Sequence, residues 1–130
     1  MLFRIIMKIL AFFILLISST SFADEYETNF NIEKFKFAQN NGKIVVIHSW
    51  NKSCRTCAKQ KPILEKAKKD FKNIIFMNFE QNKNKDIAKL LKIDYWTTIV
   101  VYKDNKELAR EIGLYNEEDI YNLIKKGIKS

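Results

Sequence analysis

Proline, glycine and histidine are scarce in this sequence. Pro62 is the only proline, His48 is the only histidine, and there are three glycines among 130 residues. So few prolines and glycines exclude a linker-rich or low-complexity chain. One histidine beside two cysteines, Cys54 and Cys57, gives fewer than the four ligands that a closed structural zinc site needs. The length and the 47% hydrophobic content predict one globular domain with a buried core.

The sequence also lacks a long basic block, although its formal net charge is +8. Lysines are scattered among acidic residues from Glu33 to Lys129, without the interleaved aromatic residues of a nucleic-acid surface. The charge therefore predicts a solvated surface and no nucleic-acid partner. Weak attraction to anionic membranes or acidic partners stays open.

The first 23 residues differ from the rest of the chain. Two basic residues precede an unbroken apolar run at 9–17, and small residues, Ser21 and Ala23, stand at the −3 and −1 positions of a cleavage site. This pattern is typical of a secretory signal peptide. The run is shorter than the roughly 20 residues of a comfortable membrane span.

We therefore expect a signal peptide at 1–23 and a single domain at 24–130, exported to the periplasm. Cleavage after Ala23 is favoured over an uncleaved membrane anchor, and no stable membrane span is expected after cleavage. No cysteine lies near the cleavage site, which argues against a lipid anchor. Without the two basic residues of the leader, the formal charge of the chain falls from +8 to +6.

Both cysteines lie in one stretch, Cys54-Arg55-Thr56-Cys57. An exported protein meets an oxidising compartment, where structural disulfides normally close long loops. This pair closes almost none. Two thiols at the start of a predicted helix, directly after a buried strand, favour a redox pair.

Hydrophobic periodicity and turn residues predict an α/β domain with a mixed sheet and helices on both faces. The expected order is helix 29–41, strand 43–48, helix 54–71, strand 74–79, helix 86–91, strand 98–102, strand 107–112 and a last helix capped by Asn116. Pro62 is expected to kink the helix that follows the cysteines.

Five features stand in a fixed order along the chain: a tryptophan before the cysteines, the Cys-x-x-Cys pair, a helix proline, a loop before a strand, and a glycine after a hairpin. They are Trp50, Cys54 with Cys57, Pro62, residues 93–99 and Gly113. Together they resemble the thioredoxin family over about residues 30–127. The resemblance implies the thioredoxin fold, thiol–disulfide oxidoreductase activity on protein thiols and disulfides, no cofactor, and a monomer.

Three positions depart from the family pattern. Ser53 stands where the family usually has tryptophan, His48 stands where it has a buried acid, and Thr97 stands where it has a cis-proline. A cis bond between Trp96 and Thr97 would cost about 2.5–4 kcal/mol, so this loop is either strained or trans and reshaped. The chain therefore resembles a divergent exported relative.

The predicted chemistry follows from the position of Cys54 at the N-terminus of the helix expected at 54–71. Cys54 is expected to be the exposed nucleophile with a lowered pKa, because the helix N-terminus and Arg55 stabilise its thiolate. Cys57, one turn further on, is expected to be the shielded resolving thiol. His48 is a candidate to accept the proton of Cys57 with a pKa near the working pH. The alternative is a strand histidine held by packing and one hydrogen bond.

Trp50, Trp96 and Thr97 are candidate substrate-binding residues. Trp50 is expected to pack beneath the loop of the cysteines, with a pure core role as the alternative. Trp96 would join Tyr95 in a partner-binding surface, or else pack at the end of the sheet. Thr97 places a hydroxyl beside the thiols, where it would bond Cys54 or admit a water or a metal.

Two features bear on the redox direction and favour opposite directions. The domain lacks the inserted helical region typical of dedicated oxidases of this fold, which slightly favours a reductase, fed by a membrane electron donor. Oxidation of exported proteins is the alternative, and Arg55 favours it by stabilising the reduced form.

Two other functions are alternative hypotheses. One is a soft-metal module that binds copper through Cys54 and Cys57, and the other is a redox-silent adaptor. Lys52 occupies the methionine position of the Met-x-Cys-x-x-Cys copper motif, and Ala58 replaces the histidine of a haem-attachment motif. Both substitutions argue against those two metal chemistries, and no metal site is predicted.

Overall fold

A computed structural model describes residues 2–3 and 26–130. The apolar run and the cleavage site of the expected signal peptide lie outside the described residues. The folded part contains helices and strands in the predicted order. They are α2 (Ile32–Asn40), β1 (Ile44–Trp50), α3 (Arg55–Asp70), β2 (Ile74–Glu80), α4 (Lys85–Leu91), β3 (Thr98–Lys103), β4 (Lys106–Ile112) and α5 (Glu117–Lys129).

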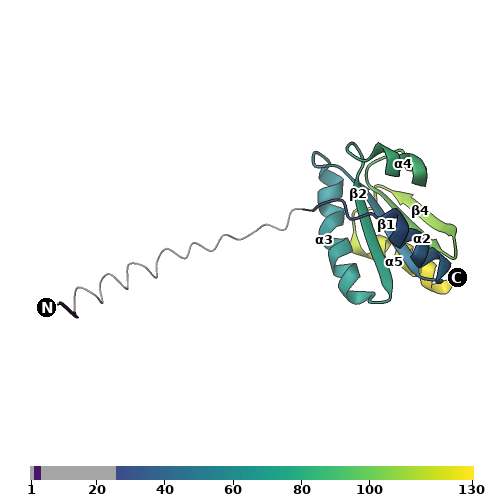
Figure 1. Ribbon diagram of the computed structural model, residues 1–130, viewed down its shortest axis with the longest axis horizontal. Helices are drawn as coiled ribbons and strands as arrows, with labels where there is room; N and C mark the ends of the chain where they lie inside the picture. Colours follow the sequence, from purple (N-terminus) through teal and green to yellow (C-terminus); the bar gives the residue numbers. More distant parts are fainter. Residues whose placement is uncertain (1, 4–25) are drawn as a thin grey trace.

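The four strands form one mixed sheet in the order β2-β1-β3-β4 (Figure 1). β1 pairs in parallel with β2 and antiparallel with β3, and β3 pairs antiparallel with β4. The prediction of a mixed sheet is confirmed. β1 lies inside the sheet and is buried along almost its whole length, as its lack of alternation predicted.

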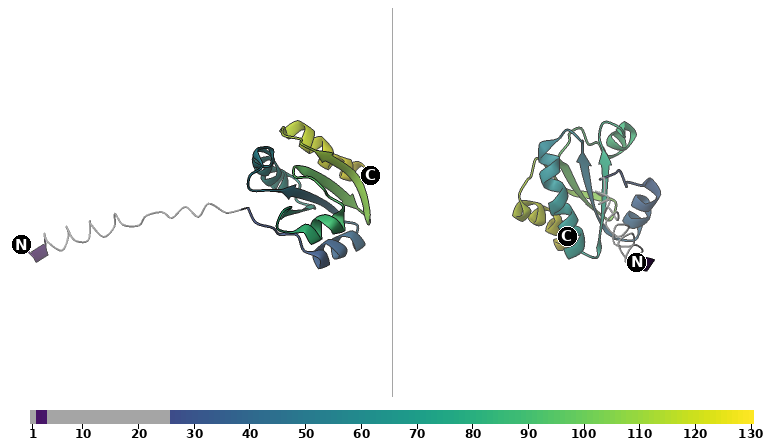
Figure 2. Two further views of the ribbon diagram at one scale, coloured as in Figure 1. Left: turned by 90° about the horizontal axis from the view of Figure 1, so that it is seen from above. Right: turned by 90° about the vertical axis from the view of Figure 1, so that its left-hand side faces the viewer.

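Helices cover both faces of the sheet (Figure 2). On one face, α2 and α4 pack against alternate side chains of β1, including Val45 and Ile47. On the other face, α3 and α5 pack against Val46 and its neighbours in β3. Because side chains alternate along a strand, His48 points to the same face as Val46 and toward α3.

Side-chain caps fix where the helices begin. Asn31 accepts a hydrogen bond from the backbone N–H of Lys34 and caps α2, and Asn116 accepts one from Asp119 and caps α5. The first turn of α5 carries three acidic residues, which the helix dipole favours.

The sheet brings the loop after β1 and the loop before β3 to the same end. His48 near the end of β1 lies opposite Ile99 near the start of β3. Trp50 and the cysteines that follow it are therefore at the end of the sheet where Thr97 lies. Two segments that are about 40 residues apart in sequence form one site in this way.

Candidate active site

Cys54 and Cys57 form a disulfide, with their Cα atoms 5.2 Å apart. Cys54 is the N-cap of α3, and its Sγ accepts a hydrogen bond from the backbone N–H of Cys57 at 3.0 Å. The sulfur thus occupies the place where a capping oxygen usually sits, at the positive end of the helix. α3 continues as one helix through Pro62.

The expectation that Cys54 is exposed is wrong for this oxidised state. Cys54 is 8% exposed and Cys57 is 4% exposed, so both residues are largely buried. Trp50 and the half-buried Tyr26 pack against the pair. Sequence reasoning placed no residue before α2 at the site, and Tyr26 supplies that missing cover.

A pocket of about 210 Å³ gives access beside the disulfide. Its lining joins the N-terminal segment, the loop after β1 and the first turns of α3. The lining residues are Tyr26, Trp50, Asn51, Lys52, Cys54, Cys57, Ala58 and Lys61. The Lys61 ammonium lies 4.8 Å from the centre of the Tyr26 ring, so one wall of the pocket carries positive charge.

Trp50 lies beneath the loop, as expected. It is 5% exposed, its ring centre is 5.1 Å from that of Tyr26, and its indole N–H donates to the Asn78 side-chain oxygen at 2.8 Å. A tryptophan held on both sides in this way supports the disulfide loop. It reaches the pocket as a wall rather than as an exposed contact surface.

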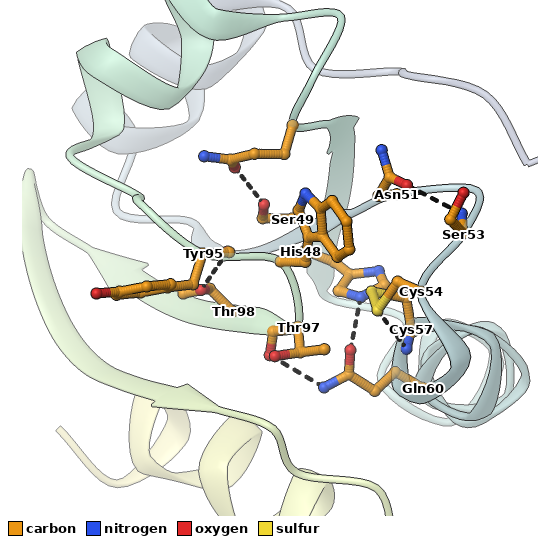
Figure 3. Close-up of a disulfide and its surroundings, with 12 residues drawn as sticks. His48, Ser49, Asn51, Ser53, Cys54, Cys57, Gln60, Tyr95, Thr97 and Thr98 are labelled. Atoms are coloured by element: carbon orange, nitrogen blue, oxygen red, sulfur yellow. Dashed lines mark hydrogen bonds between the residues drawn. A yellow bond between two sulfur atoms is a disulfide. The ribbon is translucent and has the colours of Figure 1, made fainter.

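His48 is 2% exposed and is held at both ring nitrogens. Nε2 lies 2.9 Å from the Gln60 side-chain oxygen (Figure 3). Nδ1 lies 3.1 Å from the Tyr26 hydroxyl. Burial lowers the pKa of His48 to about 4, against a smaller opposing effect of the Gln60 hydrogen bond. The expectation of a pKa near the working pH is therefore wrong, because burial removes the His48 ring from the water that would stabilise the imidazolium.

The partners of Gln60 identify the tautomer of His48. The Gln60 amide nitrogen donates to the carbonyl oxygens of Thr97 and Leu114, so its oxygen must face His48 as an acceptor. Nε2 of His48 therefore carries the hydrogen. Burial raises the pKa of Tyr26, so the Tyr26 hydroxyl is protonated and donates to the lone pair of Nδ1. The neutral ring thus has no unoccupied lone pair for a proton from Cys57.

The loop before β3 is trans and reshaped. Residues 26–130 contain no cis peptide bond, and Thr97 has a φ of 62°. This left-handed conformation is unusual for a β-branched residue. The carbonyl oxygen of Thr97 accepts hydrogen bonds from Gln60 at 3.0 Å and from the Gly113 backbone at 3.1 Å. Of the two alternatives set by the sequence, the reshaped trans loop is the one observed.

Two aromatic residues stand exposed just before Thr97. Tyr95 is 64% exposed, and Trp96 is 37% exposed with its indole N–H donating to Asn82 at 3.1 Å. The Tyr95 carbonyl is held by the Thr98 hydroxyl at 2.7 Å. Both residues are exposed directly before β3, and their expected role in a partner-binding surface stays a prediction.

The metal-carrier alternative rests on Cys54 and Cys57. Within the described residues, no group of three or more histidine, cysteine and acidic side chains is placed to hold a metal ion. The two soft ligands, Cys54 and Cys57, are joined to each other.

Within the part of the chain that the structure describes, no helix is long and apolar enough to cross a bilayer.

Sequence reasoning missed Tyr26 and Gln60. A polar residue on the inward stripe of α3, one turn after Cys57, was the signal available for Gln60. No comparable signal marked Tyr26, which lies outside every helix and strand and comes to the site only through the fold.

Comparison with known proteins gives a consistent result. The family model described as Thioredoxin matches residues 24–126. A thioredoxin of Coprinus comatus is 30% identical over 100 residues, which cover 75% of this chain and 93% of that protein. Thioredoxin H5 of Arabidopsis thaliana is 29% identical over 98 residues, covering 73% of this chain and 80% of that protein.

Solved structures show the same fold. Trxlp from Edwardsiella tarda EIB202 has a TM-score of 0.69 at 16% identity, covering 73% of this chain and 94% of that one. Fasciola hepatica thioredoxin has a TM-score of 0.65 at 24% identity, covering 73% and 91%. With the family pattern matched over most of its length and the Cys54–Cys57 disulfide at the start of α3, the chain belongs to the thioredoxin family and is a thioredoxin-type thiol–disulfide oxidoreductase.

Proposed function

We propose that this protein is an exported reductase of disulfides in partner proteins, with Cys54 as the attacking thiol and Cys57 as the resolving thiol. The observation that supports these roles is the position of Cys54 at the N-cap of α3. There the Cys57 N–H points at its sulfur, and a thiolate would gain from both the hydrogen bond and the helix dipole. Export is supported by the signal-peptide pattern of residues 1–23.

The exchange proceeds in two displacements. The Cys54 thiolate attacks one sulfur of the partner disulfide, forms a mixed disulfide and releases the other partner sulfur as a thiolate. The Cys57 thiolate then attacks Sγ of Cys54, forms the Cys54–Cys57 disulfide and releases the second partner thiolate. Two electrons pass to the partner, and two protons complete its thiols.

The proton of Cys57 needs an acceptor in the second step. Tyr26 and Gln60 occupy both nitrogens of His48, so we assign this proton to water in the pocket that Cys57 lines. His48 then serves to hold the site together, while solvent carries the proton.

The short connection from β2 to β3 supports the reductive direction. It carries only the seven-residue helix α4, with no inserted helical region. Oxidation of exported proteins is the alternative, because the Cys57 N–H and Arg55 would stabilise the reduced form. We further propose a membrane electron donor that regenerates the dithiol, and a monomeric protein.

The reduction potential of the Cys54–Cys57 pair decides the direction. Equilibration with a series of glutathione buffers is expected to give a value near the thioredoxin end of the scale, about −270 mV. A value near about −120 mV, typical of a strong oxidant, would reverse the assignment. Export is tested separately by determining the first residue of the secreted protein, which is expected to be Asp24.

Two serine variants test the roles of the cysteines. Cys54→Ser is expected to lose insulin-disulfide reduction, because no attacking thiolate is left. Cys57→Ser is expected to accumulate a mixed disulfide with the partner, which non-reducing gels detect. Insulin reduction that persists in Cys54→Ser would show that another group performs the chemistry.

A further inference from the structure

Gln60 is an unusual residue for its place in the fold. It lies on the buried face of α3, one turn after Cys57, and is fully buried at 0% exposure. An uncharged amide without access to water is costly unless every polar atom has a partner. Gln60 meets this demand only through groups outside its own helix.

Three bonds connect Gln60 to three other parts of the site, and Figure 3 shows those to His48 and Thr97. Its oxygen accepts from His48 on β1 at 2.9 Å. Its nitrogen donates to the carbonyl of Thr97, before β3, at 3.0 Å and to that of Leu114, after β4, at 2.7 Å. The helix that carries both cysteines is thereby joined to the strand and to both loops.

The bond to Thr97 acts on strained backbone. A left-handed β-branched residue persists only where its surroundings hold it. Gln60 and Gly113 both donate to the Thr97 carbonyl, so the orientation of this peptide is fixed from two sides. Gln60 thus holds the reshaped loop in place of the ring that a proline would supply.

The bond between Gln60 and His48 determines which ring nitrogen of His48 carries the hydrogen. As an acceptor, the Gln60 oxygen keeps the hydrogen of His48 on Nε2 and leaves Nδ1 to accept from Tyr26. Tyr26 also lines the pocket beside the disulfide. One amide therefore determines the state of a chain of groups that reaches from the buried sheet to the pocket.

We propose that Gln60 is a positioning residue for disulfide exchange, which fixes the Nε2–H tautomer of His48 and holds the Thr97 loop beside the Cys54–Cys57 pair. This role rests on the proposed exchange at that pair. One amide thus positions both His48 and Thr97, the residues that stand where the family has a buried acid and a cis-proline.

Gln60→Met tests the proposal, because methionine keeps most of the volume and none of the hydrogen bonds. Gln39→Met is the matched control. Gln39 is 3% exposed and accepts a hydrogen bond from the Asn105 backbone, but it lies before β1, at the opposite end of the sheet from the disulfide.

The readouts are the rate of insulin reduction and the exchange equilibrium with glutathione. Gln60→Met is expected to slow the reaction about tenfold, the equivalent of one lost hydrogen bond, and to shift the equilibrium. Gln39→Met is expected to lower stability without either change. A folded Gln60→Met variant with the wild-type rate and equilibrium would overturn the proposal.

A measurement on the unaltered protein covers the case in which Gln60→Met does not fold. The ¹⁵N chemical shifts of the single histidine distinguish its tautomers. The Nε2–H form is expected at neutral pH, and an Nδ1–H form would overturn the proposal. Failure here leaves insulin reduction by the wild-type protein intact, so it is distinct from failure of the proposed function.

Discussion

Thr97 shows how one replacement reshapes a site without removing its chemistry. A proline at this position would fix φ near −65°, whereas Thr97 has a φ of 62°. The carbonyl that follows is aligned by Gln60 and Gly113 instead of by a ring. The loop has therefore kept its place at the end of the sheet with a different backbone path.

Restoring the family residue is expected to harm this protein. Thr97→Pro cannot adopt the observed φ, so we expect it to lose more than about 1 kcal/mol of unfolding free energy. Thr97→Gly is the control, because glycine accepts the left-handed conformation, and its stability is expected to stay close to that of the wild type. Urea unfolding measures both. Equal stability of the proline variant and the wild type would contradict the left-handed conformation.

His48 predicts a specific dependence of stability on pH. Its pKa is about 4 in the folded protein and about 6.5 in an unfolded chain, so the unfolded state binds a proton first as the pH falls. Stability is therefore retained above pH 6.5 and lost between about 6.5 and 4, at up to about 1.4 kcal/mol per pH unit.

The measurement compares urea unfolding of the oxidised wild type with His48→Gln over this range. Because glutamine does not titrate, the difference in stability between the two proteins is expected to change as the pH falls. Parallel curves would show that burial of His48 does not shift its pKa.

At the scale of elements, α5 approaches the sheet through a glycine. A Cβ on Gly127 would lie 2.9 Å from side-chain carbons of both Ile44 and Val101. Gly127→Ala is expected to destabilise the protein by about 1–3 kcal/mol through overpacking, more than the gain of about 1 kcal/mol in helix propensity.

The matched control for α5 is Lys126→Ala, an exposed change next to the glycine. It is expected to stay within about 0.5 kcal/mol of the wild type. Thermal or urea unfolding measures both variants. A stabilised Gly127→Ala protein would mean that the helix shifts away from the sheet at no cost.

The order of elements was predictable because each one carries its own local signal. Unbroken apolar runs predicted β1 and β2, and asparagine caps predicted the start of α5. The inward position of Gln60 was predictable, but the roles of Gln60 and Tyr26 were not, since they depend on which groups the fold brings to them from distant parts of the chain. The burial that lowers the pKa of His48 is a tertiary effect for the same reason.

At the scale of the whole molecule, residues 26–30 form a strap along β2, which is an edge strand of the sheet. Thr28 accepts from the Glu80 backbone at 2.9 Å, and Asn29 accepts from the Asn78 backbone at 2.7 Å. These bonds satisfy edge groups that would otherwise be exposed. They also hold Tyr26 at the disulfide pocket.

The strap predicts unequal effects of fusions at the two ends. A folded domain fused directly before Tyr26 is expected to slow insulin reduction by crowding the pocket, while exchange with a small thiol reagent stays unchanged. The same domain fused after Ser130 is expected to have little effect. There the Ser130 carbonyl is held by Lys103, at the end of β3 away from the site. Equal rates for the two fusions would contradict this arrangement.

The strap places the start of the folded domain at the disulfide pocket, whereas Ser130 lies at the end of the sheet away from it. Anything that anchors the protein through the segment before Tyr26, whether a resin, an electrode or a bilayer, turns the redox pair toward the anchoring surface. Anchoring through Ser130 turns the pair outward to freely diffusing partners. The choice of the anchored end thus decides whether the disulfide exchanges with partners bound to the same surface or with partners that diffuse in solution.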